Sequence, residues 1–305
     1  MRAILIQLSQ SRRLRLFSER TSLVQRLSRR FVAGNTMEEA LRVAAEFNRQ
    51  GIAVTLDVLG ESVTSARQAR EAAEAYHRLI DAITERKLVA NVSLKLTQMG
   101  LDLSPALAEG IVAGLAGHAA RVGSFVRVDM EGSAHTQQTL DMVWRLHSLP
   151  DLDGAIGTVL QAYLYRSEVD VDLMLSEGIR LRLCKGAYLE SSAAAFPHKQ
   201  EVDANYLHLA KRLLKSSVRH AIATHDERMI DAILRFVREE KIDPRSFEFQ
   251  MLYGIRRDLQ QSLNGQGYNV RVYLPFGREW FPYFMRRLAE RPANLFFLLR
   301  NLFHQ

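Results

Sequence analysis

Cysteine is almost missing from this chain. The 305 residues include one cysteine, Cys184, so no disulfide bond can form within the chain. A lone cysteine fits a protein that works in a reducing compartment. Long apolar runs are missing too, and no stretch approaches the roughly 18 consecutive apolar residues of a membrane-spanning helix. We therefore expect a globular cytoplasmic protein.

Several site motifs are also absent. The chain contains no GxGxxG, P-loop, HExxH or GxSxG sequence. Their absence argues against a Rossmann dinucleotide site, a P-loop nucleotide site, a zincin metal site and a hydrolase nucleophile. The histidines lack metal-ligand spacing, so we expect no metal ion.

Acidic residues are scarce at the N-terminus. Residues 1–30 contain eight arginines and one acid, Glu19, whereas the other 275 residues carry 33 basic and 33 acidic side chains. The net charge of +7 therefore belongs to this N-terminal arm. We favour a helix packed on the domain; a basic helix that contacts anionic lipid and a transit peptide stay open. Nucleic acid is not an expected partner, because no aromatic platform or reader motif accompanies the arginines.

What the chain does have is a recurring unit, a short β-rich run followed by a segment with helical periodicity. After the first run, Ala69, Tyr76 and Ile83 belong to an apolar series that repeats at three and four residues. After the sixth run, Asp226 can cap a helix. The eight runs are residues 53–59, 89–96, 125–131, 157–162, 179–185, 220–225, 247–252 and 270–276.

Eight such units predict a parallel sheet closed into a (β/α)8 barrel of the TIM type, an α/β fold. An open, doubly wound sheet is the alternative. Residues before the first strand predict extra N-terminal helices, one of which begins near Asn35 or Thr36, ahead of Glu38 and Glu39. We divide the chain into a basic helical arm, residues 1–50, and the catalytic barrel, residues 51–305.

Polar residues alternate with aliphatic ones in several runs, although strands covered by helices are usually aliphatic throughout. The aliphatic side can face the helices, so the polar side must line the lumen. Charges there are costly unless they are paired or serve a ligand. We place eight polar residues at the C-terminal mouth, where such barrels hold their sites: Lys95, Asp129, Gln161, Arg182, Lys185, His225, Glu248 and Gln250.

Each of these residues also has a purely structural interpretation. Lys95 and Asp129 could form a structural ion pair, the glutamines could satisfy lone donors, and His225 could be a core histidine. Their convergence favours a polar site. The last unit adds a second group: Tyr273 within the run, then Tyr283, Arg286 and Arg287 after it. Adjacent arginines suit the capture of a carboxylate or phosphate, with a solvated basic helix face as the alternative.

Eight ordered segments carry a resemblance to a known family. They are LDVLGES (56–62), SLKL (93–96), VDMEGS (128–133), VLQAYLYRS (159–167), RLCKGAY (182–188), ATHD (223–226), FEFQMLYG (247–254) and YFMRRLAERPAN (283–294). Over residues 52–295 the chain resembles the proline dehydrogenases, including the proline dehydrogenase domain of the bifunctional proline utilisation flavoproteins. The resemblance implies a barrel that binds FAD and oxidises L-proline to Δ1-pyrroline-5-carboxylate by hydride transfer to flavin N5.

The resemblance also implies roles for individual residues. Arg286 and Arg287 hold the proline carboxylate, and Glu61 pairs with the first of them as a gate. Lys95 and Asp129 lie beside the substrate, and Arg182 lies near flavin N5. The proline ring packs on Tyr273, Tyr283 and Leu252. The cofactor contacts are Met130, Gln161, Arg182, Lys185, Gly186, Ala187, Tyr188, Thr224 and His225.

One departure is Leu189, where several relatives carry tryptophan. The chain has no room for an aldehyde dehydrogenase domain, so a separate pyrroline-5-carboxylate dehydrogenase must follow. We expect a quinone as electron acceptor, with the arm or the apolar residues 295–303 as a peripheral contact to the inner face of the membrane. Two rival functions stay open: a Schiff-base aldolase that uses Lys95 or Lys185, and a membrane-associated binding protein.

Overall fold

A computed structural model describes residues 28–152 and 154–290. Eight parallel strands form a closed barrel in sequence order, with the last strand paired to the first. This confirms the predicted (β/α)8 fold and excludes the open sheet. The strands are β1 (Ala53–Val58), β2 (Ala90–Lys95), β3 (Val126–Asp129), β4 (Ile156–Gln161), β5 (Arg180–Cys184), β6 (Ala221–Ala223), β7 (Glu248–Leu252) and β8 (Asn269–Phe276).

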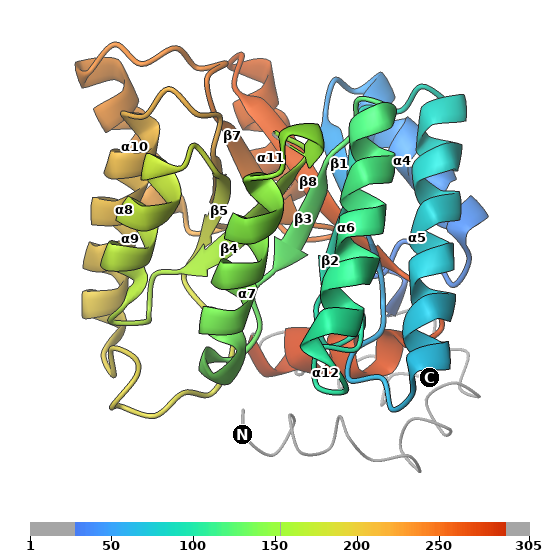
Figure 1. The fold of residues 1–305 in the computed structure, drawn as a ribbon. Coiled ribbons are helices and arrows are strands. Elements are labelled where there is room, and N and C mark those ends of the chain that lie inside the picture. Colours follow the sequence, from blue (N-terminus) through green and yellow to red (C-terminus); the bar gives the residue numbers. More distant parts are fainter. Residues whose placement is uncertain (1–27, 153, 291–305) are drawn as a thin grey trace, which may run out of the picture.

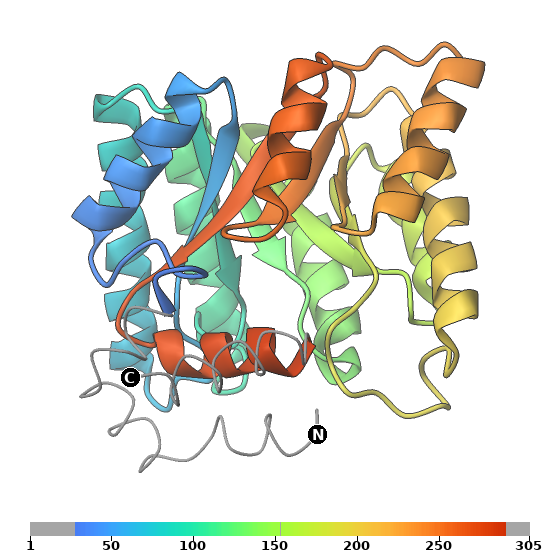
Figure 2. The ribbon, with the colours of Figure 1, turned by 180° about the vertical axis from the view of Figure 1, so that it is seen from behind.

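Helices surround the barrel, as Figures 1 and 2 show from opposite sides. A 3-10 turn, Pro150–Leu152, precedes β4. The helices are α4 (Met37–Arg49), α5 (Ala66–Glu85), α6 (Pro105–Arg121), α7 (Ser133–His147), α8 (Ser167–Ser176), α9 (Lys199–Leu214), α10 (Glu227–Glu239), α11 (Arg257–Gly265) and α12 (Trp280–Glu290). Within the described ranges, none is both long and apolar enough to cross a membrane.

Two helix starts confirm predictions made from single residues. Thr36 is the N-cap of α4 and forms a reciprocal capping box with Glu39. Asp226 caps α10 by accepting a hydrogen bond from the backbone N–H of Arg228. The extra helix before β1 is therefore present, and it contacts β1 and β8.

The two sides of the strands also divide as predicted. Val92 and Leu94 of β2 and Val126 and Val128 of β3 are fully buried between strands and helices. The residues between them point into the lumen. The hydrophobic core is therefore a ring between sheet and helices, which leaves the barrel interior for polar side chains.

The last described helix has a different place from the others. In both views α12 lies across the end of the barrel at which the strands finish. It is held there by a separate apolar cluster in which Phe284 contacts Phe31 and Trp280, at centroid distances of 6.2 and 5.9 Å. This helix therefore covers the mouth of the barrel.

Some predictions fall on residues outside this description. Of the arginine-rich residues 1–30, the described part of the chain includes only Ser28, Arg29 and Arg30. The apolar residues 295–303 lie outside it. Nothing in the described ranges tests the division between residues 1–50 and 51–305, so that boundary stays a prediction.

Candidate active site

Asp129 is the centre of the polar network at the mouth. It ends β3 and accepts hydrogen bonds from Ser93 Oγ at 2.6 Å, Arg182 Nη1 at 2.7 Å and Tyr273 Oη at 2.7 Å. Burial acts to raise the pKa of Asp129, but Arg182 and Lys95 outweigh it, so this pKa lies below its ordinary value. The carboxylate is therefore ionised and joins four strands.

Lys95 lies between two carboxylates. Its Nζ is 3.5 Å from Asp57 Oδ2 and 3.9 Å from Asp129 Oδ2. Burial acts to lower the pKa of Lys95, yet the two acids hold it above its ordinary value. Burial raises the pKa of Asp57, which is 1% exposed. Lys95 thus provides a fixed positive charge beside the Asp129 hub.

Arg182 connects the mouth to the middle of the lumen. Its Nε donates to Gln250 Oε1, and its guanidinium carbon lies 5.3 Å from the centre of the Tyr273 ring. Its Nη2 is buried and has no hydrogen-bond partner among the described residues. This spare donor points to a polar ligand that the protein chain does not supply.

The structure corrects the prediction for Glu248. This residue begins β7, so it lies toward the opposite end of the barrel and not at the mouth. It accepts from Arg271 Nε at 2.8 Å, and the attraction of Arg271 outweighs burial to lower the pKa of Glu248 to about 2. Glu248 is therefore half of a structural ion pair, although it also supports Gln250 through a hydrogen bond.

The residues predicted to contact a cofactor lie at or after the C-terminal ends of β3 to β6. Gln161 Nε2 donates to the Glu131 carbonyl at 2.8 Å, and Met130, which precedes Glu131 in sequence, is buried. His225 Nε2 accepts from the Leu252 backbone N–H at 2.8 Å, and Thr224 Oγ1 accepts from the Asp226 N–H at 3.1 Å. These contacts fix the side chains in place around one part of the rim.

Lys185 and the residues after it continue this rim beyond β5. Lys185 Nζ contacts Asp203 of α9 at 2.5 Å and the cap residue Asp226 at 2.7 Å. Gly186 has a φ of +115°, and a Cβ there would lie 2.3 Å from the Tyr163 ring. Only glycine fits this position. Ala187 is exposed, and burial raises the pKa of Tyr188 to about 12.

The predicted substrate residues meet where α12 crosses the mouth of the barrel. Arg286 Nη1 donates to Glu61 Oε1 at 2.6 Å, and this pair brings α12 to the connection after β1. Burial acts to lower the pKa of Arg286, but Glu61 outweighs it and raises that pKa. The Arg287 guanidinium lies 5.2 Å from the Tyr283 ring centre, and Leu252 packs against the cluster that contains Tyr283.

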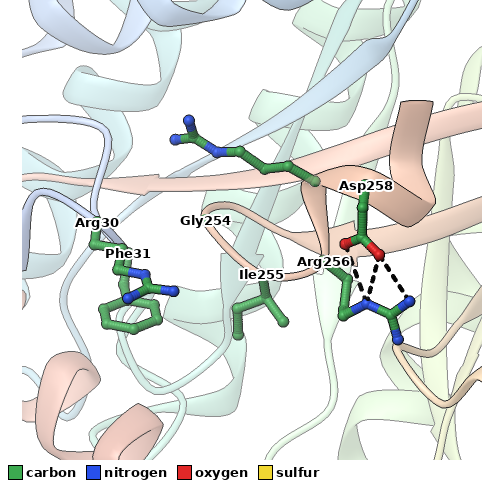
Figure 3. Close-up of a pocket in the computed structure, with 7 residues that line it drawn as sticks. Arg30, Phe31, Gly254, Ile255, Arg256 and Asp258 are labelled. Carbon is green, nitrogen blue, oxygen red and sulfur yellow. Dashed lines mark hydrogen bonds and ion pairs between the residues drawn. The ribbon is translucent and has the colours of Figure 1, made fainter. Parts of the chain in front are cut away.

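A surface pocket of about 490 Å³ lies beside the cluster that contains Tyr283 (Figure 3). Two of its charged groups pair with each other, Arg256 with Asp258 at 2.9 Å, and Arg256 also contacts Glu227 at 3.4 Å. Among the described residues that line it, none has a buried side-chain polar atom that lacks a hydrogen-bond partner, as Arg182 does, so the polar network around Asp129 is the better candidate site. The pocket is lined by Arg30, Phe31, Gly254, Ile255, Arg256, Arg257 and Asp258.

Sequence reasoning did not name several residues of the site. Strand alternation places Ser93 and Glu131 on the lumen side but assigns them no role, and Asp57 occurs in a matching segment without being named. Glu131 accepts from both the backbone N–H and the Oγ1 of Thr97, at 3.1 and 2.7 Å. No local pattern predicts that contact, because it joins two loops.

Comparisons with known proteins identify the family of the chain. The family model for proline dehydrogenase matches residues 40–300. The chain belongs to the proline dehydrogenase family. It is therefore an oxidoreductase that acts on a CH–NH donor.

Individual relatives agree over nearly the whole chain. Proline dehydrogenase 1 of Bacillus subtilis strain 168 is 42% identical over 303 residues, 99% of each chain. The proline dehydrogenase of Deinococcus radiodurans is 42% identical over 285 residues, 90% of each. A solved structure of proline utilization A from Bdellovibrio bacteriovorus, inactivated by N-propargylglycine, matches with a TM-score of 0.82 at 26% identity. That match covers 88% of this chain and 33% of the larger protein.

Proposed function

We propose that this proline dehydrogenase oxidises L-proline to Δ1-pyrroline-5-carboxylate with FAD and passes the electrons to a quinone-type acceptor. The observation that supports this best is the arrangement around Asp129. An ionised acid, a lysine and an arginine with an unused donor lie beneath a helix that carries two arginines. Such a mouth suits a small zwitterion held beside a polar ring.

The residues present fit a flavin. The buried Nη2 of Arg182 can donate to a flavin ring atom. Beside Arg182 in the lumen, β6 contributes only the small side chains of Ala221 and Ala223, as the strand register indicates. Gly186 allows the rim to approach closely. FAD, when bound there, would accept a hydride at N5.

The substrate groups follow from charge. Arg286 and Arg287 would hold the proline carboxylate, which would replace Glu61 as the partner of Arg286. Asp129 would stabilise positive charge on the ring nitrogen, while Lys95 keeps the two acids from repelling each other. Tyr273, Tyr283 and Leu252 would pack on the ring and exclude water. Positioning of the C–H bond then supplies much of the rate.

The product and the electrons leave to other partners. A separate pyrroline-5-carboxylate dehydrogenase would use the product. A quinone is a membrane component, so the proposal includes peripheral membrane contact, by residues 1–30 or by the apolar residues 295–303.

The colour of the purified protein, after incubation with FAD and removal of the unbound cofactor, tests the proposal. A yellow protein whose flavin absorbance bleaches on anaerobic addition of L-proline supports it. A colourless protein that borohydride traps covalently with a carbonyl substrate would instead support the aldolase. If neither response occurs, the binding-protein hypothesis is the one that remains.

A further inference from the structure

The connection between β5 and α9, residues 185–198, is attached to the β4–α8 connection at two places. Near its start, the Tyr163 N–H donates to the Lys185 carbonyl at 2.9 Å. Near its end, Tyr165 N–H donates to the Ala194 carbonyl at 3.1 Å, and Phe196 N–H donates to the Tyr163 carbonyl at 2.8 Å. Residues 186–190 lie between these points, and the Leu189 side chain is 59% exposed. This middle part needs another attachment to stay in place.

Glu190 supplies that attachment. Its Oε1 accepts from the backbone N–H of Ser133 at 2.7 Å and from Tyr163 Oη at 3.4 Å, and its Oε2 accepts from Ser133 Oγ. The connection after β5 is thereby tied to the first residue of α7, which lies 57 residues away in sequence.

The N-terminus of α7, which supplies the donors, is suited to a carboxylate. Ser133 begins α7, and the N-cap residue Gly132 makes no side-chain cap hydrogen bond. The free N–H groups and dipole at a helix N-terminus favour a negative charge. Glu190 therefore caps α7 from a different loop, and helix and loop stabilise each other. Glu190 and Ser133 are both half-buried, so their contact is not one between exposed surface groups.

The other end of the segment is tightly packed. Gly186 lies so close to Tyr163 that a Cβ would overlap its ring. Residues 186–189 are thus pressed on Tyr163 at one end and tied to α7 at the other. They include Gly186, which the proposed function places against the flavin, and Ala187 and Tyr188, which the resemblance implies as further cofactor contacts.

We propose that Glu190 is a positioning residue that holds residues 186–189 closed over the flavin site. This inference rests on the proposed use of FAD. The contacts with Ser133 must break before the cofactor enters or leaves, so they control its exchange. The contacts of Glu190 do not include the substrate arginines of α12, but Tyr188 in the segment that they hold lies near Arg286 and Lys95, so loosening this segment should also affect proline binding.

The test measures FAD dissociation from the loaded enzyme, followed by the recovery of free-flavin fluorescence after dilution. Glu190→Ala removes both hydrogen bonds from Ser133, and because the loss of even one charge-assisted hydrogen bond corresponds to about tenfold, it should release FAD at least about tenfold faster than the parent. Glu190→Gln keeps the shape and an acceptor oxygen, so its effect should be smaller. Ser133→Ala keeps the backbone donor and should be intermediate. Adding Ser133→Ala to Glu190→Ala should change nothing further, because the contact is already gone.

Two controls separate this role from general damage. Glu109→Gln breaks an exposed ion pair with Arg145 and should leave FAD release unchanged. With saturating FAD, proline should still reduce the flavin of every Glu190 variant, because the groups around Asp129 are unchanged. Equal FAD release from Glu190→Ala and the parent overturns the inference and leaves the flavoenzyme intact. A Glu190 variant whose flavin proline no longer reduces at saturating FAD would also overturn it, in favour of a structural role. A parent protein that binds no FAD would overturn both proposals.

Discussion

Arg286 and Arg287 are the residues whose proposed role has the largest measurable consequence. Replacing either by glutamine removes charge-assisted hydrogen bonds to the substrate carboxylate from a partly desolvated site. Such losses are on the order of 2–5 kcal/mol, or roughly 30- to several-thousand-fold in apparent affinity for proline. Stopped-flow reduction of the flavin over a range of proline concentrations measures this change. Lysine should restore only part of it, because a point charge lacks the planar fork.

The control for the arginine variants is Arg145→Gln, which removes a similar charge from the outer surface of α7. It should leave the proline dependence unchanged, and all variants should retain flavin. Unchanged concentration dependence in both the Arg286 and Arg287 variants would show that the pair does not hold the carboxylate.

His220 makes the stability of the fold depend on pH. Its Nδ1 accepts from the Leu181 N–H at 3.0 Å, and its Nε2 lies 2.8 Å from Ser216 Oγ. Burial, with the nearby charges of Arg127 and Arg180, lowers the pKa of His220 from 6.5 to about 3. The unfolded chain therefore takes up a proton below pH 6.5 that the folded chain does not. Stability from this residue is complete above pH 6.5 and falls as the pH drops toward 3.

Between pH 6.5 and 5 this linkage should cost about 1.5 kcal/mol of unfolding free energy. Urea unfolding at both pH values measures it, and His220→Asn is the comparison, because its amide oxygen can accept from Leu181 without titrating. Parent and variant should differ in their pH dependence by that amount. Parallel pH profiles would rule out this role for His220.

Residue type and strand alternation predicted the Asp129, Lys95 and Arg182 cluster correctly. Alternation determines which side of a strand a residue occupies, and its place in the first or second half of the strand determines the end of the barrel at which it lies. Glu248 was misplaced because it is polar and on the lumen side but begins its strand. The contacts of Glu190 and Glu131 could not be predicted, since the partners of these residues depend on how loops meet in space.

At the scale of elements, we expect the packing of α12 to control proline binding separately from flavin binding. Phe284 is 2% exposed and joins this helix to Phe31 and Trp280. Phe284→Ala removes this packing, and core truncations of phenylalanine cost about 3–5 kcal/mol. Because α12 carries both substrate arginines, we expect a large rise in the KM for proline with little change in flavin binding.

Phe236→Ala provides a matched truncation on α10, a helix that carries no predicted substrate residue. Phe236 packs beneath Lys211 and Lys215. It should lower the unfolding temperature without changing the KM. If both variants raise the KM equally, α12 has no separate role in substrate binding.

Elements with strong periodicity were the predictable ones. The eight strands and the capped helices α4 and α10 follow from local patterns. Helices α8 and α11 have 10 and 9 residues, and their sequences are too short for a clear period. The position of α12 across the mouth could not be read from sequence, because its own amphipathic pattern does not say which surface it covers.

At the scale of the whole molecule, charge is divided unevenly between arm and barrel. If residues 1–30 contact anionic lipid, binding to vesicles that contain phosphatidylserine should weaken as salt rises, because exposed charges are screened. Vesicle sedimentation at low and high salt measures this. A protein lacking those residues should lose vesicle binding, and unchanged binding would favour a packed helix instead.

The closure of the barrel sets the order of events during synthesis. Strand β1 pairs with β8 over six residues, from Ala53 with Arg271 to Val58 with Phe276. The ribosome must add more than two hundred residues after β1 before that partner exists, which takes roughly 10–40 s at ordinary rates of translation. Throughout that time one edge of β1 is an open template for pairing with other chains. The nascent protein is therefore most vulnerable to aggregation before its last strand appears, and it needs protection during translation more than after release.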